Sequence, residues 1–216
     1  MPARPTRPIE TRTRRIITKL KKTYPNAHCE LNHSNPLQLL IATILSAQCT
    51  DERVNKVTPA LFARCRTAKD YSEISSVELE DLIRTTGFFR SKAKSIRGCA
   101  TALVKNHGGE VPKTMKDLHQ LAGVGRKTAN VVLGNAFNLA EGIVVDTHVG
   151  RLSRRMGLTR QMDPVKVEQA LIKIVPKKDW TLFSHLLIWH GRRRCSARRP
   201  DCEHCEIQKL CPKRGI

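Results

Sequence analysis

Acidic residues, aromatic residues and long apolar stretches are all scarce in this chain of 216 residues. Only 19 Asp and Glu oppose 39 Lys and Arg, which gives a formal net charge of +20 at pH 7. Such an excess calls for a polyanion or an acidic surface as partner, and nucleic acid is the first candidate. The longest apolar run, "PLQLLIATILSA" at 36–47, is interrupted by Gln38. It is shorter than the roughly 18 residues of a membrane-spanning helix, so we expect no membrane partner.

Alternating strand patterns, internal repeats and low-complexity tracts are also missing from the pattern of residues. Apolar residues nevertheless make up 40% of the chain, which suffices for a folded core in one domain or two small ones. The basic, Pro-rich N-terminus, residues 1–15, lacks the apolar centre of a secretory signal. We expect a flexible arm there, with a short transit peptide as the alternative. Without export, the eight cysteines should be thiols or metal ligands rather than disulfides.

Helix start and stop signals follow one another along the whole chain. Ser34 or Asn35 can cap a helix that opens with proline, Ser76 can cap the segment 77–86, and Gly87 ends it. Further helices are expected over 51–65, 90–107, 113–121, 126–137, 147–158, 164–175 and 179–194. The pattern therefore predicts an all-α protein.

The stretch "GVGRKTANVV", residues 123–132, predicts a tight turn between two helices within about 115–137. Gly123 and Gly125 allow the positive φ that such a turn needs. The amides of the turn and of the following helix start then lack intrahelical partners and form an anion site. On a basic chain the natural anion is a DNA backbone phosphate, which positions the protein without reading sequence. The alternative is an ordinary helix corner whose glycines only permit close packing.

Lys127, directly after this turn, and Asp146 are a candidate chemical pair. A helix over 126–137 followed by an extended run over 142–146 can bring Asp146 back to the neighbourhood of Lys127. The amine can attack a sugar C1′ and form a Schiff base, while the carboxylate deprotonates the amine or stabilises the cationic sugar. Two plainer roles remain open: a surface cation for Lys127, and a helix cap for Asp146.

Four of the cysteines lie within one short segment near the C-terminus, which we call the cysteine loop, residues 195–211. The spacing C-x6-C-x2-C-x5-C comprises Cys195, Cys202, Cys205 and Cys211. Four thiols so close in sequence predict a metal centre, with zinc as one candidate. Arg198 and Arg199 make the loop basic, and we expect them to contact phosphate, with a solvated charge run as the alternative. The other four, Cys29, Cys49, Cys65 and Cys99, are expected to be buried free thiols.

Together with "LLIATILSAQCTD", "GFFRSKA", "GEVP", "VVDTH" and "HGRRRC", these motifs resemble the endonuclease III family of bacterial helix-hairpin-helix DNA glycosylases. The resemblance runs from about Ile9 to Cys211, and the cysteine spacing matches the family's pattern for a [4Fe-4S] cluster. It implies a six-helix barrel domain at 28–140 that contains the hairpin. It also implies a second helical domain, 1–27 plus 141–216, that carries the cluster, with the DNA cleft between the two.

The resemblance further implies a bifunctional glycosylase and abasic-site (AP) lyase of base excision repair, acting on oxidised pyrimidines in double-stranded DNA. Lys127 would be the Schiff-base nucleophile and Asp146 its carboxylate partner. Gln48 would fill the gap left by an everted nucleotide. Phe88 stands where the family often has a leucine wedge, so its larger ring is a departure. Arg126 is expected to contact DNA beside the hairpin, and we expect a cytoplasmic, nucleoid-associated monomer.

Other departures and rivals remain. Ala122 replaces the proline that usually precedes the hairpin glycines, and His148 either shapes the site or is a satisfied structural histidine. The adenine glycosylase branch usually has a small residue at the position of Lys127 and a further C-terminal domain, whereas this chain ends five residues after Cys211. A lysine-bearing relative that prefers pyrimidine dimers, and a non-catalytic DNA-binding module that uses the hairpin alone, are the remaining alternatives.

Overall fold

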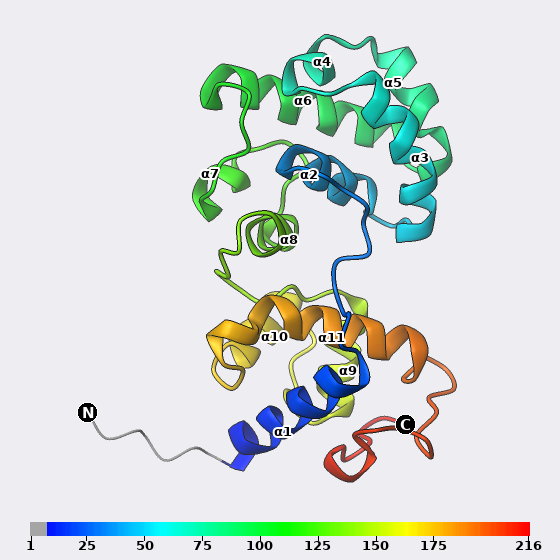
Figure 1. The fold of residues 1–216 in the computed structure, drawn as a ribbon, viewed down its shortest axis with the longest axis vertical. Helices are drawn as coiled ribbons and strands as arrows, with labels where there is room; N and C mark the ends of the chain where they lie inside the picture. Colours follow the sequence, from blue (N-terminus) through cyan, green and yellow to red (C-terminus); the bar gives the residue numbers. More distant parts are fainter. Residues whose placement is uncertain (1–7) are drawn as a thin grey trace, which may run out of the picture. The chain divides into compact units, whose positions relative to one another are not determined.

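The structure is a computed structural model that describes residues 8–216, and the regular elements within this range are all helical (Figure 1). The predicted all-α class is therefore confirmed. No helix in the described range is both long and apolar enough to cross a membrane. Residues 1–7 of the expected N-terminal arm lie outside the described residues. The rest of that prediction is wrong, because Pro8–Thr23 form helix α1, which buries Ile16, Ile17 and Leu20 along one face.

The chain divides into two compact units. The middle unit is Cys29–Glu141, and the terminal unit combines the residues up to His28 with Gly142–Ile216. Each unit has its own hydrophobic interior, so each is described by itself.

The middle unit is built around an almost wholly buried helix, α2. Helices α3, α6 and α8 pack on α2, while α4 and α5 pack on α6. The elements are α2 (Pro36–Leu45), α3 (Asp51–Arg64), α4 (Ala68–Glu73), α5 (Ser76–Ile83), the 3-10 turn η1 (Arg84–Thr86), α6 (Phe89–His107), α7 (Met115–His119) and α8 (Arg126–Ala136). Helix α2 reads as a continuous apolar run in the sequence because its neighbours cover it on several sides.

Side-chain caps fix most of the helix starts in this unit. The Asn35 side chain accepts a hydrogen bond from the Gln38 amide at 2.9 Å, as the Pro-led start of α2 predicts. Helix α5 is capped by Ser75, so the prediction of Ser76 as cap was one residue late. Helix α4 was not predicted, because it is too short to show a helical pattern of apolar residues. The capping box of Thr67 and Asp70 fixes its start.

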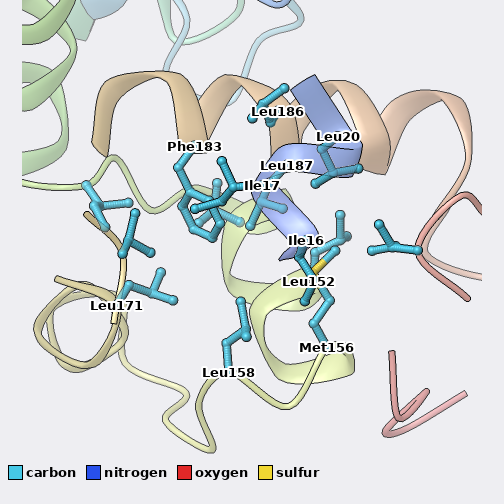
Figure 2. Packing of buried hydrophobic residues seen from close by; sticks show 14 of the residues in the cluster. Ile16, Ile17, Leu20, Leu152, Met156, Leu158, Leu171, Phe183, Leu186 and Leu187 are labelled. Carbon is cyan, nitrogen blue, oxygen red and sulfur yellow. The ribbon is translucent and has the colours of Figure 1, made fainter. Parts of the chain in front are cut away.

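The terminal unit joins the N-terminal helix to the last third of the chain. Its elements are α1, α9 (Thr147–Arg155), α10 (Pro164–Leu171), the 3-10 turn η2 (Lys177–Asp179), α11 (Trp180–Arg193) and the 3-10 turn η3 (Gln208–Leu210). Figure 2 shows buried side chains of these helices pointing into one core, among them Ile16, Leu152, Leu171, Phe183 and Leu187. The core holds α1 against α11, although the two lie more than 150 residues apart in sequence.

A partly buried polar contact supplements this core. The Arg12 guanidinium donates hydrogen bonds to the carbonyl oxygens of Met156, Gly157 and Leu210, at 2.5, 3.0 and 3.0 Å. Met156 and Gly157 directly follow α9, and Leu210 belongs to η3. Arg12 thereby ties α1 to the segment that carries the last cysteine.

Candidate functional site

The hairpin forms as predicted in outline, with α7 and α8 packed together on either side of the turn. Gly123 has φ of +76°, and a Cβ built there would lie 2.8 Å from the Cβ of Ser95. Gly123 is therefore required by the fold itself. Gly125 differs: its φ is −86°, so the prediction of positive φ at this residue is wrong. A Cβ at Gly125 would meet nothing within 4 Å, and the folded chain gives no steric reason for glycine there.

The start of α8 lacks the side-chain cap that most helices of this chain have. Gly125 occupies the capping position and offers no side chain to the amides of the first turn. Seven other helices have a side-chain cap, supplied by Asn35, Thr50, Thr67, Ser75, Thr114, Asp146 and Asp163. Lys127 is the second residue of α8, and its side chain is exposed. The helix therefore presents a positive end with a lysine amine beside it.

Asp146 caps α9 in the terminal unit. Its Oδ1 accepts a hydrogen bond from the Val149 amide at 2.7 Å, which confirms the capping role that the sequence allowed. The residue is half-buried, and its other carboxylate oxygen is not used by this cap. Lys127 belongs to the middle unit, so its meeting with Asp146 in one site stays a prediction.

His148 is a satisfied histidine packed on the backbone of α11. Its Nδ1 lies 3.3 Å from Arg151 Nη2, and a Cβ added at Gly191 would approach this Nδ1 to 2.6 Å. Burial holds the pKa of His148 below its ordinary value, and the Arg151 charge acts in the same direction, while Asp146 opposes it. A neutral imidazole that accepts from Arg151 fits the structural alternative for this residue.

Gln48 and Phe88, the predicted gap-filling and wedge residues, share an unusual backbone. Their φ values are +51° and +47°, in the left-handed region that favours glycine. Gln48 is exposed, and Phe88 exposes 66% of its surface. Below the Phe88 turn, the buried Lys92 amine donates to the Thr86 carbonyl at 2.8 Å, and burial lowers its pKa. The fold thus supports two strained loops that hold large side chains out in solvent.

The four cysteines of the cysteine loop line one cavity, with about 360 Å³ of space including its open mouth. Among the described residues, no three His, Cys, Asp or Glu side chains converge closely enough to hold a single metal ion. Burial raises the pKa of Cys205 to about 11 and also raises that of Cys211. The remaining cysteines partly contradict the prediction, because Cys65 and Cys99 are buried but Cys29 and Cys49 are only half-buried.

Two buried residues support this loop, and the sequence analysis assigned neither of them a role, although His190 begins the quoted motif "HGRRRC". Arg155 donates to Cys195 Sγ at 3.3 Å and to the carbonyls of Ser196 and Ala197 at 2.6 Å each. His190 places Nε2 3.5 Å from Cys205 Sγ and Nδ1 3.0 Å from the Tyr24 hydroxyl. Both depend on contacts between residues far apart in sequence, so no local spacing could have revealed them.

Not every arginine in or beside the cysteine loop is available to an anionic partner. Arg198 and Arg199 are exposed, on a turn in which the Ser196 hydroxyl donates to the Arg199 carbonyl at 2.5 Å. Arg194, by contrast, pairs with Asp201 at 2.6 Å and Glu206 at 3.1 Å. Arg198 and Arg199, unlike Arg194, are therefore exposed cations that a partner can reach.

Comparisons with known proteins agree with this geometry. Residues 41–177 match the family model of the HhH-GPD superfamily base excision DNA repair proteins. The chain is 53% identical to "Endonuclease III" of Synechocystis sp. over 93% of this chain and 92% of that protein. It is 45% identical to the protein in a non-covalent endonuclease III–DNA complex, with a TM-score of 0.89, over 94% of this chain and 95% of that one. A trapped endonuclease III–DNA covalent intermediate matches with the same TM-score and identity, over 94% and 96% of the two chains. The chain therefore belongs to the HhH-GPD superfamily and is a base excision DNA repair enzyme.

Proposed function

We propose that this chain is a bifunctional DNA glycosylase and AP lyase that removes oxidised pyrimidines from duplex DNA. The observation that carries the proposal is the start of α8, where an uncapped positive helix end lies beside the exposed Lys127 amine. A relative that is 45% identical has been trapped as a covalent DNA intermediate, which supports a nucleophilic mechanism. We propose that it works as a monomer in the cytoplasm, on DNA of the nucleoid.

DNA binding would begin with phosphates. The open face of Gly125 lets a phosphate approach the amides of α8, and Arg126 lies next to them. Arg198 and Arg199 would hold a second stretch of backbone at the tip of the cysteine loop. Contacts of this kind bind any sequence and weaken steeply with salt.

A damaged nucleotide would then be everted, which costs least for a base that is already poorly stacked. Gln48 and Phe88 are suited to fill the vacated space, since their backbone holds them out in solvent before DNA arrives. This arrangement spares the complex some of the entropy of ordering two side chains.

The chemistry would use Lys127 as nucleophile. Its neutral amine forms a bond to C1′ while the C1′–N bond to the base breaks and the base leaves with a proton. The Asp146 carboxylate takes up the amine proton or stabilises the cationic sugar. The C1′–O4′ bond then breaks, O4′ takes up a proton as the sugar ring opens, and the adduct becomes a protonated imine. The imine makes the C2′ proton acidic, and loss of that proton expels the 3′ phosphate by β-elimination. Water then hydrolyses the imine and restores the lysine.

We propose that the cysteine loop holds a [4Fe-4S] cluster, and its side chains fit such a group. Cys195, Cys202, Cys205 and Cys211 face one cavity, and Arg155 donates a hydrogen bond to Cys195 Sγ. Since burial raises the pKa of Cys205 and Cys211, a cationic centre is what would convert these thiols to thiolates. When bound, the cluster would cross-link the loop and keep Arg198 and Arg199 in place.

The test of the catalytic proposal is trapping with borohydride. The protein is incubated with duplexes that contain thymine glycol, an abasic site or a pyrimidine dimer, and borohydride is added to reduce any imine. We expect a covalent adduct with the first two, and none from Lys127→Ala. Lys116→Ala, which removes an exposed lysine from α7 of the same hairpin, should trap as the wild type does.

The same experiment separates the remaining alternatives. Adducts formed only with the dimer duplex would indicate the pyrimidine-dimer branch of the family. Equal DNA affinity and no adduct for the wild type and Lys127→Ala would mean a non-catalytic binding module, and the proposal would be abandoned.

A further inference from the structure

The terminal unit contains a hollow lined almost entirely by arginines. Its lining residues are Arg151, Arg154, Arg155, Thr159, Arg160, Arg214 and Gly215, and it holds about 770 Å³ of space including its open mouth. No carboxylate lies among these lining residues. We call it the arginine hollow. It uses neither Lys127, nor Asp146, nor the exposed tip of the cysteine loop.

The fold brings these arginines together from three segments. Arg151, Arg154 and Arg155 lie three and four residues apart in α9, so they share one side of the helix. Beyond α9 the chain turns sharply at Gly157, whose φ is +61°, and leads to Thr159 and Arg160. The C-terminal segment returns to the same place, because the Arg214 amide donates to the Arg155 carbonyl at 3.0 Å.

The inner and outer arginines of the hollow differ in their partners. Arg151 donates to the Cys195 carbonyl at 2.9 Å, and Arg155 donates to the carbonyls of Ser196 and Ala197. These inner guanidiniums therefore already donate hydrogen bonds to the start of the cysteine loop. Arg154 is half-buried and Arg160 is exposed, and both face the same hollow without a carboxylate beside them.

The electrostatics of the hollow are unfavourable without an anion. The Nε of Arg151 is buried and donates no hydrogen bond. In the same unit, Asp201 and Glu206 neutralise the half-buried Arg194. Arg154 and Arg160 therefore add to the positive charge of a hollow that has no carboxylate among its lining residues.

We infer that the arginine hollow binds phosphate groups of a DNA backbone, as a contact additional to the hairpin and the cysteine loop. Guanidinium groups present planar, paired donors that match phosphate oxygens. The hollow is open, so a continuous strand can pass along it. The inner arginines also place it next to the loop that carries Arg198 and Arg199. This inference rests on the proposed DNA partner, and free polyphosphate offers the same chemistry from another source.

The test is the salt dependence of DNA affinity. The double variant Arg154→Ala/Arg160→Ala leaves the inner arginines and their loop contacts intact. Its control is Lys166→Ala/Lys173→Ala, which removes the same charge from two exposed positions in the same unit, one in α10 and one just after it. Affinity for a duplex with an uncleavable abasic-site analogue is measured between 50 and 200 mM salt, with circular dichroism to confirm folding.

We expect the arginine variant to reduce the slope of log affinity against log salt by about 2, since each lost phosphate contact removes about 0.9. Affinity near 100 mM salt should fall about tenfold or more, and the control should retain the wild-type slope within about 0.5. Equal slopes for the two variants would overturn the inference. A wild type that does not bind duplex DNA would overturn both this inference and the proposed function. Equal slopes, by contrast, would overturn only this inference.

A second arm tests the source of the phosphate. Tripolyphosphate is titrated into the wild type and the arginine variant by calorimetry, and is also used to compete with the duplex. We expect weak binding that the arginine variant loses, together with competition against DNA. Tripolyphosphate binding without any effect of the variant on the DNA salt slope would assign the hollow to a small anion and overturn the DNA assignment.

Discussion

Gly123 packs directly against Ser95, so that a Cβ on the glycine would lie 2.8 Å from the Cβ of the serine. The same glycine has φ of +76°, whereas Gly125, two residues later, has φ of −86° and open space at the position of a Cβ. The two glycines of one motif are therefore kept for different reasons. The first is demanded by the fold, and the second is free for a ligand to approach.

Alanine substitutions should separate these two roles. Gly123→Ala adds both a left-handed alanine and a clash with Ser95, and we expect it to lower the free energy of unfolding by about 2 kcal/mol or more. Gly125→Ala should leave stability unchanged within about 0.5 kcal/mol but weaken duplex binding about tenfold, because its methyl group occupies the phosphate's approach. Urea unfolding and a DNA titration measure the two effects. A Gly125→Ala protein with wild-type DNA affinity would contradict the phosphate contact.

Local chemistry made most of the fold predictable. Asn35 before Pro36 and Asp163 before Pro164 fix helix starts through contacts within four residues. The sequence predicted a cap at Ser34 or Asn35 and a helix that starts at Pro164. Helix α1 was missed at its start because Pro and Arg dominate its first residues. Its helix depends on burying Ile16 and Leu20 in a core made by residues that are distant in sequence.

The candidate site was predictable to the same limit. The hairpin, Lys127 and the four cysteines belong to motifs that can be recognised from the order of residues alone. The sign of φ at Gly125 could not be predicted from the sequence, because glycine permits either sign and only the path of the folded chain selects one. The neutralisation of Arg194 by Glu206 and the support of Cys195 by Arg155 arise from side chains that meet only in the folded unit.

Two buried tyrosines offer a matched pair for testing the support of the cysteine loop. The Tyr24 hydroxyl lies 3.0 Å from Nδ1 of the buried His190, while the Tyr71 hydroxyl is buried with no hydrogen-bond partner. Tyr24→Phe should lower the free energy of unfolding by about 1 kcal/mol, because it leaves an imidazole nitrogen unpaired. Tyr71→Phe should be neutral or stabilising, since it removes an unsatisfied polar group. Thermal unfolding of the two variants checks the difference, and equal losses would contradict it.

His185 should make the protein sensitive to mild acid. Burial lowers the pKa of this histidine to about 4, from an ordinary value near 6.5, with the charge of His28 acting in the same direction. Below about pH 6.5, His185 therefore binds a proton in the unfolded chain but not in the folded chain. The free energy of unfolding consequently decreases as the pH falls towards 4. The full effect for this one group is about 3 kcal/mol.

The variant His185→Gln should flatten that acid loss. Chemical unfolding is measured at pH 8 and at pH 5, for the wild type and for the variant. We expect the variant to lose less stability than the wild type between the two values. The same loss in both proteins would show that His185 is not the group responsible.

Phe88 should display a conflict between stability and function. Its φ of +47° is strained for any residue with a Cβ, and its ring is 66% exposed, so the fold gains little from the side chain. Phe88→Gly should raise the free energy of unfolding by about 0.5–1 kcal/mol by relieving the strain. The same change should reduce turnover of a damaged duplex, because the proposed wedge is lost, while trapping at a preformed, already unpaired abasic site falls less. Val77→Ala, at a residue 71% exposed on α5, is the control for losing an exposed apolar side chain and should leave turnover unchanged. If Phe88→Gly turns over damaged duplex as fast as Val77→Ala does, the strained loop has another purpose than wedging DNA.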